Sequence, residues 1–201
     1  ANNLATAGAV EGGWSAARII KYAADTYNIS PKALIVLLQK EQGLVTDEWP
    51  WPGQYRSATG YGCPDTAPCD AEYYGFYNQV VNAAKAFRRY ATYPQNYRYK
   101  TGQTNYIQYN PNSACSGNEV FIQNQATAGL YIYTPYQPNL AALNNLYGTG
   151  DSCSAYGNRN FWRMWTDWFG PPSLSKAVVK SNVLGSGVYL IENETKRPFD
   201  S

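Results

Sequence analysis

The sequence predicts a mainly α-helical domain with a short β-hairpin, followed by a short β-rich segment at the C-terminus. Apolar residues recur at helical spacing in several stretches before residue 170. A glycine-containing turn separates two tyrosine-rich runs near residue 102. Gly170-Pro171-Pro172 then indicates a linker. We therefore expect one domain over residues 1–170, and over 171–201 a linker and the start of a β-rich repeat or of a truncated second module.

Two helices are expected first. Residues 14–27 carry a broad apolar face, and Asn28 closes that helix. The second helix begins with Ser30 as N-cap and Pro31 in the first turn, and it ends at Gly43, because each residue type is typical of its position.

The remaining elements are shorter, apart from one long helix. Residues 44–70 are expected to form loops, and Asp70 to cap the long helix. The hairpin is expected to pair residues 97–99 with 106–109, and residues 119–122 are expected to be extended. The helices are expected over 71–91, 124–133, 139–147 and 158–169, the last of them buried on most sides, and a strand is expected over 188–191.

Composition excludes several kinds of chemistry. The 201-residue chain has no histidine, so histidine-based nucleophilic sites and histidine-ligated metal sites are excluded. We expect no metal and no cofactor. Its net charge is only +2, and no basic stripe that would indicate nucleic-acid binding is present. No run of apolar residues is long enough to span a membrane.

Aromatic residues are abundant instead, with 19 tyrosines and 6 tryptophans. A surface rich in tyrosine and amides suits a neutral, hydroxyl-rich ligand such as a sugar. The alternative is a tyrosine-rich core and rim in a secreted protein.

Four cysteines indicate two disulfides in an oxidising compartment, and hence a secreted or cell-surface protein. Their spacing does not match paired zinc ligands. Of the three possible connectivities we favour Cys63–Cys69 and Cys115–Cys153. Free buried thiols are the alternative.

One carboxylate has an unexpected position. Glu41 follows Leu34, Leu37 and Leu38 at spacings of seven, four and three, so it lies on the apolar stripe of its helix, whereas Lys40 lies off that stripe. It also lies in the last helical turn, where the helix dipole disfavours negative charge. Burial and the dipole should both raise the pKa of this carboxyl, which would suit a general acid. The alternative is that Glu41 leans out and pairs with a nearby Lys or Arg, or caps backbone amides of the following loop.

The segment Ala33–Leu44 resembles the catalytic helix of the lysozyme-like superfamily, especially the lytic transglycosylases and goose-type lysozymes. In that pattern an apolar helix ends in Glu, and a glycine-rich segment about 20 residues later lines the cleft. Thr59-Gly60-Tyr61-Gly62 occupies that place, with Gly60 19 residues after Glu41. The resemblance covers residues 10–170 and implies a lysozyme-like α+β domain of a secreted bacterial surface protein. Gln42 stands where the transglycosylases usually have Ser.

The resemblance implies a glycosidase that cleaves the β-1,4 linkages of peptidoglycan glycan strands, with Glu41 as general acid and base. Asp65 is a candidate second carboxylate for hydrolysis, or else a turn residue after Pro64. Without a second carboxylate, a hydroxyl of the sugar itself attacks the anomeric carbon and gives an anhydro product, as in a lytic transglycosylase. Candidate substrate-binding residues are Gln42, Thr59, Tyr61, Tyr131, Tyr133 and Tyr136, and Trp49 and Trp51 are further candidates for sugar stacking.

A non-catalytic adhesin that binds carbohydrate or cell wall on the same scaffold is the rival interpretation, because aromatic residues suit it equally well. The two differ in their need for Glu41, since a binding module requires no proton donor. We expect a monomer that binds neither nucleic acid nor a membrane.

Overall fold

The computed structural model describes residues 4–5, 8–65, 67–172, 176–180, 188–192 and 195–198, the last three ranges by their backbone. The chain divides into two compact units, Ala1–Met164 and Trp165–Ser201. The division falls inside a helix, six residues before the expected end of the first domain at residue 170.

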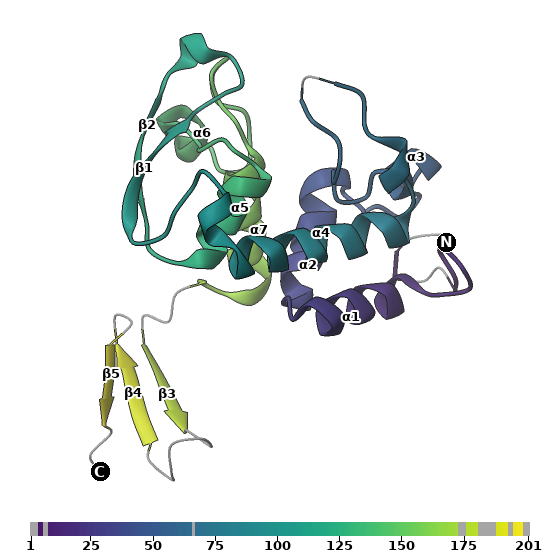
Figure 1. The fold of residues 1–201 in the computed structure, drawn as a ribbon, viewed down its shortest axis with the longest axis horizontal. Coiled ribbons are helices and arrows are strands. Elements are labelled where there is room, and N and C mark those ends of the chain that lie inside the picture. The colour runs from purple at the N-terminus through teal and green to yellow at the C-terminus, as the bar shows by residue number, and fades with distance from the viewer. Residues whose placement is uncertain are drawn as a thin grey trace. The chain divides into compact units, whose positions relative to one another are not determined.

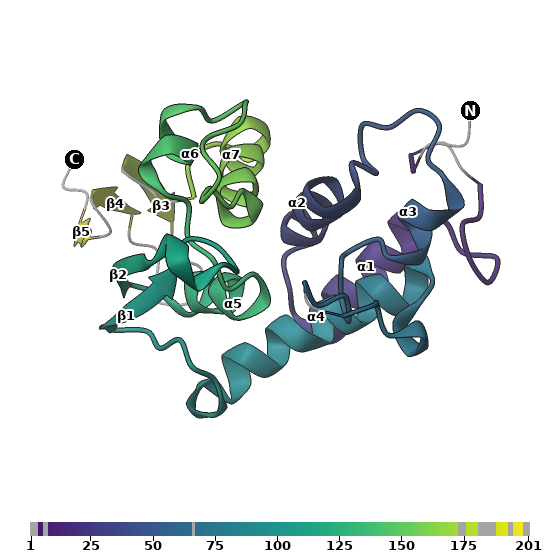
Figure 2. The same cartoon turned by 90° about the horizontal axis from the view of Figure 1, so that it is seen from above.

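The first unit is mainly helical and contains one two-stranded antiparallel hairpin, which confirms that part of the predicted fold class (Figure 1). Its elements are α1 (Ala16–Tyr27), α2 (Pro31–Gln42), α3 (Pro52–Arg56), α4 (Phe76–Thr92), β1 (Gln103–Gln108), β2 (Gly117–Ile122), α5 (Gln125–Tyr133), α6 (Leu140–Asn144) and the first part of α7 (Gly157–Phe169), with short 3-10 turns at Ala71–Tyr73, Pro94–Asn96 and Ser113–Cys115. Helix α4 is central, because it contacts α1, α2, α3 and α5 (Figure 2).

Capping residues set the ends of the first two helices much as the sequence predicts. The Ser15 hydroxyl accepts a hydrogen bond from the Arg18 amide and caps α1, and Asn28 closes α1 in the left-handed conformation. Gly43 closes α2 at a φ of 67°. Ser30 precedes α2 as expected, but its side chain makes no capping hydrogen bond.

The long helix begins later than predicted. Asp70 caps only a 3-10 turn, where its carboxylate accepts from the Glu72 amide, and α4 starts after Gly75. Gly75 has no side chain that could cap α4. The carboxylate of Glu11 does so instead, accepting a hydrogen bond from the Tyr77 amide at 2.8 Å. A cap from so far along the chain cannot be read from local sequence.

The hydrophobic cores of the first unit include a larger and a smaller cluster of described residues. The larger one joins α1, α2 and α4 through residues such as Ile19, Leu34, Leu38 and Val80, all fully buried. The smaller one packs Tyr99, Ile107 and Ile122 with Ala128 of α5, and so covers one face of the hairpin.

The predicted partner of β1 is wrong. Strand β1 pairs with β2, from Gln103 opposite Ile122 to Gln108 opposite Gly117, and not with residues 97–99. Tyr99 is buried in the smaller core. The side chain of Asn105 accepts a hydrogen bond from the backbone N–H of Lys100 and donates one to its carbonyl. These bonds hold the turn at residues 101–102, so residues 97–99 do not continue as a partner strand of β1. The extended conformation expected at 119–122 is confirmed.

Other boundaries differ by smaller amounts. Helix α3 lies within the predicted loop 44–70, and α6 ends at Asn144 rather than near residue 147. Helix α7 is not buried on most sides, since Trp162 is 47% exposed. In the second unit, β3 (Lys176–Lys180), β4 (Val188–Glu192) and β5 (Thr195–Pro198) form an antiparallel sheet, which includes the strand expected at 188–191.

Both predicted disulfides are present, Cys63–Cys69 and Cys115–Cys153. They indicate an oxidising compartment. Among the described residues, no helix has the length and apolar character needed to cross a membrane.

Replacing Cys115 and Cys153 together by Ser should lower the free energy of unfolding by about 4 kcal/mol, because their separation of 38 residues closes a long loop. The same change at Cys63 and Cys69, separated by 6 residues, should lower it by only about 2 kcal/mol. Urea denaturation without reductant measures both values. A larger loss for the short loop would contradict the loop-entropy argument.

Candidate active site

Glu41 lies in the last turn of α2, and the backbone of Gly60 is close against its carboxyl. A Cβ atom at Gly60 would lie 3.1 Å from Glu41 Oε2. Gly60 also has a φ of 70°, which disfavours any residue with a side chain. The loop before α4 thus approaches the carboxyl more closely than a substituted residue would permit.

The other carboxyl oxygen of Glu41 forms an ion pair. Lys40 Nζ lies 2.6 Å from Glu41 Oε1 and donates a second bond to Thr134 Oγ1 at 2.9 Å. The Lys40 side chain is only 5% exposed, whereas that of Glu41 is 26% exposed. Gly157, at the start of α7, leaves room for Thr134, because a Cβ there would lie only 2.6 Å from the methyl carbon Cγ2 of that residue.

Consecutive residues on a helix do not normally face each other, so this pair needs an outside anchor, and Thr134 supplies it. Of the three arrangements that the sequence left open for Glu41, pairing with a nearby cation is the one present, and the side chain is partly exposed rather than enclosed by the apolar stripe. The sequence placed Lys40 off the apolar stripe of α2 and so did not predict that its side chain is buried. Val36, four residues earlier, is also fully buried, so α2 is covered on a second side.

A buried amide fixes the loop beside Glu41. Gln79 of α4 is fully buried, and its Oε1 accepts hydrogen bonds from the amides of Thr59 and Tyr61, both at 3.1 Å. Its Nε2 donates to the carbonyls of Tyr61 and Tyr73. The side chain of Gln79 therefore satisfies backbone hydrogen-bonding groups of Thr59 and Tyr61. The signal in the sequence was a polar residue on the same helical stripe as Phe76 and Ala83.

Thr59 and Tyr133, both predicted as substrate-binding residues, are brought together. The Tyr133 hydroxyl donates to the Thr59 carbonyl at 2.8 Å, and its ring stacks on Phe87 at 4.9 Å. Burial raises the pKa of Tyr133 well above its ordinary value; the bond to Thr59 opposes this shift, and the negative charge of Glu41 adds to it. The phenol is therefore a neutral donor beside Glu41.

Asp65 forms a second contact, with Tyr136. It lies on an exposed part of the short disulfide loop. Burial raises the pKa of Tyr136, and the charge of Asp65 together with a hydrogen bond to its carboxylate raises it further. The predicted second carboxylate is thus engaged with a predicted sugar-binding tyrosine.

The other predicted residues have mainly structural contacts. Tyr131 packs on the smaller core with its ring 6.1 Å from that of Tyr99, and burial raises its pKa. Tyr61 meets Tyr73 edge to face at 4.8 Å. Gln42 donates to the Ser57 hydroxyl at 3.2 Å and is half-buried.

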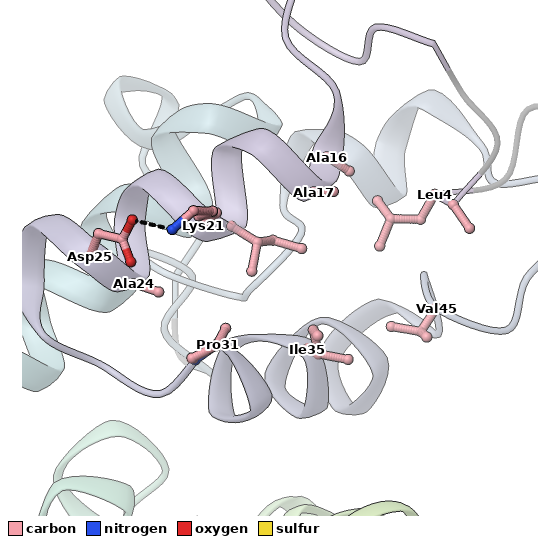
Figure 3. A pocket seen from close by; sticks show the side chains of 11 residues that line it. Leu4, Ala16, Ala17, Lys21, Ala24, Asp25, Pro31, Ile35 and Val45 are labelled. Carbon is pink, nitrogen blue, oxygen red and sulfur yellow. Dashed lines mark hydrogen bonds and ion pairs between the residues drawn. The ribbon is translucent and has the colours of Figure 1, made fainter.

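A pocket of about 450 Å³ lies elsewhere, between α1 and α2 (Figure 3). Aliphatic side chains such as Ile20, Ile35 and Val45 line it, and the ion pair of Lys21 with Asp25 lies at one side. It holds none of the predicted site residues, and apart from Lys21 and Asp25 its lining is aliphatic.

Within the described residues, no group of three or more acidic or cysteine side chains is arranged to hold a metal ion. Comparison of the chain with known protein families, with characterised proteins and with solved structures finds no match. The candidate site is therefore defined by its own geometry, around Glu41.

Gln79→Leu should destabilise the first unit by about 3 kcal/mol or more, because several buried backbone groups lose their partners at once. Urea denaturation measures the loss. Gln95→Leu, at an exposed position, is the matched control and should change stability by no more than about 0.5 kcal/mol. A loss at Gln79 as small as that of the control would show that the loop does not depend on this amide.

Proposed function

We propose that the first unit is a glycosidase that cleaves the β-1,4 amino-sugar linkages of peptidoglycan, with Glu41 as general acid and base. The observation that carries the proposal is the fixed position of a partly exposed carboxyl, held between the Gly60 backbone and the Lys40 ammonium. General acid catalysis requires a carboxyl that is held in place and can reach a ligand.

In the first step Glu41, whose partly exposed carboxyl would take up a proton from solvent, would transfer that proton to the glycosidic oxygen as the bond from that oxygen to the anomeric carbon breaks. The leaving sugar departs as an alcohol, and the other sugar becomes an oxocarbenium-like centre. Lys40 stabilises the carboxylate that remains on Glu41. That carboxylate then serves as the base of the second step.

Two nucleophiles could complete the reaction. Water positioned by a second carboxylate gives hydrolysis, and a hydroxyl of the same sugar gives an anhydro ring, its proton passing to Glu41. Asp65 is the candidate second carboxylate, but it lies on an exposed part of the disulfide loop, and its charge acts on the Tyr136 phenol. We therefore favour the intramolecular route of a lytic transglycosylase.

The proposed setting is the bacterial cell wall, reached by a secreted or cell-surface protein. The two disulfides agree with an extracytoplasmic location. The glycan strand is the proposed partner of this unit.

The rival function is a non-catalytic domain that binds carbohydrate or cell wall. A carboxylate with a purely structural role would form the same ion pair that Glu41 forms with Lys40, so this pair also fits the rival function. Assay of the products formed from peptidoglycan separates the two.

Glu41→Gln should abolish release of soluble muropeptides from purified peptidoglycan, with a loss of at least about 100-fold, because the amide cannot donate the proton. The amide oxygen can still accept from Lys40, so the fold should persist. Mass spectrometry of the released products measures the rate and distinguishes anhydro from reducing ends.

Glu119→Gln is the matched control, since Glu119 is exposed on β2. It should keep full activity. Native activity that survives Glu41→Gln would rule out the proposed acid, and native protein that binds peptidoglycan without cleaving it would establish the rival function.

Lys40→Met should lower the same activity by about 10- to 100-fold, because Glu41 loses the contact that fixes its carboxyl. Lys21→Met, which breaks an exposed ion pair with Asp25 on α1, is the control and should leave the rate unchanged. Equal rates for the two variants would remove Lys40 from the mechanism.

A further inference from the structure

Two tryptophans in the loop that follows α2 are left largely open to solvent. Trp49 is 68% exposed and Trp51 is 76% exposed, in the loop between α2 and α3. Single exposed apolar residues are ordinary, but two indoles separated by one residue in the same loop put a large apolar area in contact with solvent, and such areas mark interaction sites.

The backbone under these indoles is held firmly. The amide of Trp49 donates to Asp47 Oδ1 at 2.9 Å, and the amide of Trp51 donates to Gln54 Oε1 at 2.7 Å. Gln54 Nε2 in turn bonds Asp47 Oδ2 at 2.9 Å. Pro50 and Pro52 restrict the chain further. The indoles are therefore presented on a preformed support, which lowers the entropic cost of binding.

The same support is joined to the candidate acid. Gln54 Nε2 also donates to the carbonyl of Gln42 at 2.7 Å, and Gln42 is the residue directly after Glu41. One side chain thus links the loop of the two tryptophans to the end of α2. A ligand bound to the indoles would therefore be held by a loop that is fixed to the end of the helix carrying Glu41.

The charges around the patch select the kind of ligand. Asp47 and Glu48 precede Trp49, and hydrogen bonds from Gln54 and from the Trp49 amide lower the pKa of Asp47, which is therefore ionised. An anionic lipid surface would be repelled there, because such surfaces attract basic segments. Flat apolar faces with acidic neighbours suit the uncharged rings of an N-acetylated glycan, whose C–H faces stack on indoles.

We infer that Trp49 and Trp51 form a glycan-binding platform that holds the strand beside Glu41. This inference rests on the proposed function for its substrate class. The platform supplies binding along the strand, and neither indole takes part in the proton transfer. Its loss should therefore weaken binding even in a protein that cannot cleave.

The test uses the full chain carrying Glu41→Gln, so that the ligand is not consumed, and the hexamer of β-1,4-linked N-acetylglucosamine as probe. Replacing both Trp49 and Trp51 by Ala should raise the Kd of the hexamer, measured by calorimetry, at least about tenfold. Phe121→Ala, which removes an exposed aromatic residue of β2, is the matched control and should leave the Kd unchanged. Thermal unfolding of each variant should stay close to that of the parent, because the replaced side chains are exposed.

Three results would overturn the inference: an unchanged Kd for the double variant, tryptophan-dependent binding to phosphatidylglycerol vesicles without binding to the hexamer, or tryptophan-dependent dimerisation in sedimentation. Failure of the proposed function looks different. In that case the native chain releases no muropeptides, while the hexamer still binds and still depends on the two tryptophans, which supports the platform alone.

Discussion

The candidate site depends on one buried amide, that of Gln79. A fully buried amide is costly unless each of its groups is bonded, and here both ends are satisfied by backbone groups of residues 59, 61 and 73. These bonds determine the path of the loop and bring Gly60 against the carboxyl of Glu41. They also fix the Thr59 carbonyl that receives the Tyr133 hydroxyl. An aliphatic residue at position 79 would fill similar space but would leave the loop without its hydrogen bonds.

A buried ammonium is the second demanding feature. The side chain of Lys40 is 5% exposed, and its Nζ is partnered by one carboxylate oxygen and one hydroxyl oxygen. Its partner Glu41 keeps contact with solvent, so the pair is buried at one end only. This asymmetry separates it from the exposed pair of Lys21 and Asp25 on α1, whose side chains are 77% and 65% exposed and which screening weakens.

Local signals in the sequence sufficed for some features and not for others. Asn28, Gly43 and the spacing of Cys63 and Cys69 correctly predicted two helix ends and the short disulfide, because caps and short loops depend on nearby residues. The pairing of Cys115 with Cys153 then followed, because only these two cysteines were left. The start of α4 and the partner of β1 could not be predicted, since a distant carboxylate and a long-range register decide them. In the site, the position of Glu41 at the end of α2 was predicted, but the cation beside it was not. Its burial depends on Thr134, which lies 94 residues away in the chain.

The surroundings of Glu41 depend finally on where α5 ends. Pro135 disfavours the helical conformation at the residue before it, and Thr134 is extended, with φ −128° and ψ 95°. Asn158 holds this segment by donating to the carbonyls of Thr134 and Tyr136. Two consecutive side chains then act on the site: the Tyr133 hydroxyl bonds the loop before α4, and the Thr134 hydroxyl bonds the ammonium of Lys40. A helix continuing by even one residue would turn the Thr134 hydroxyl away from Lys40, so a proline outside the site determines the charge environment of the carboxyl within it.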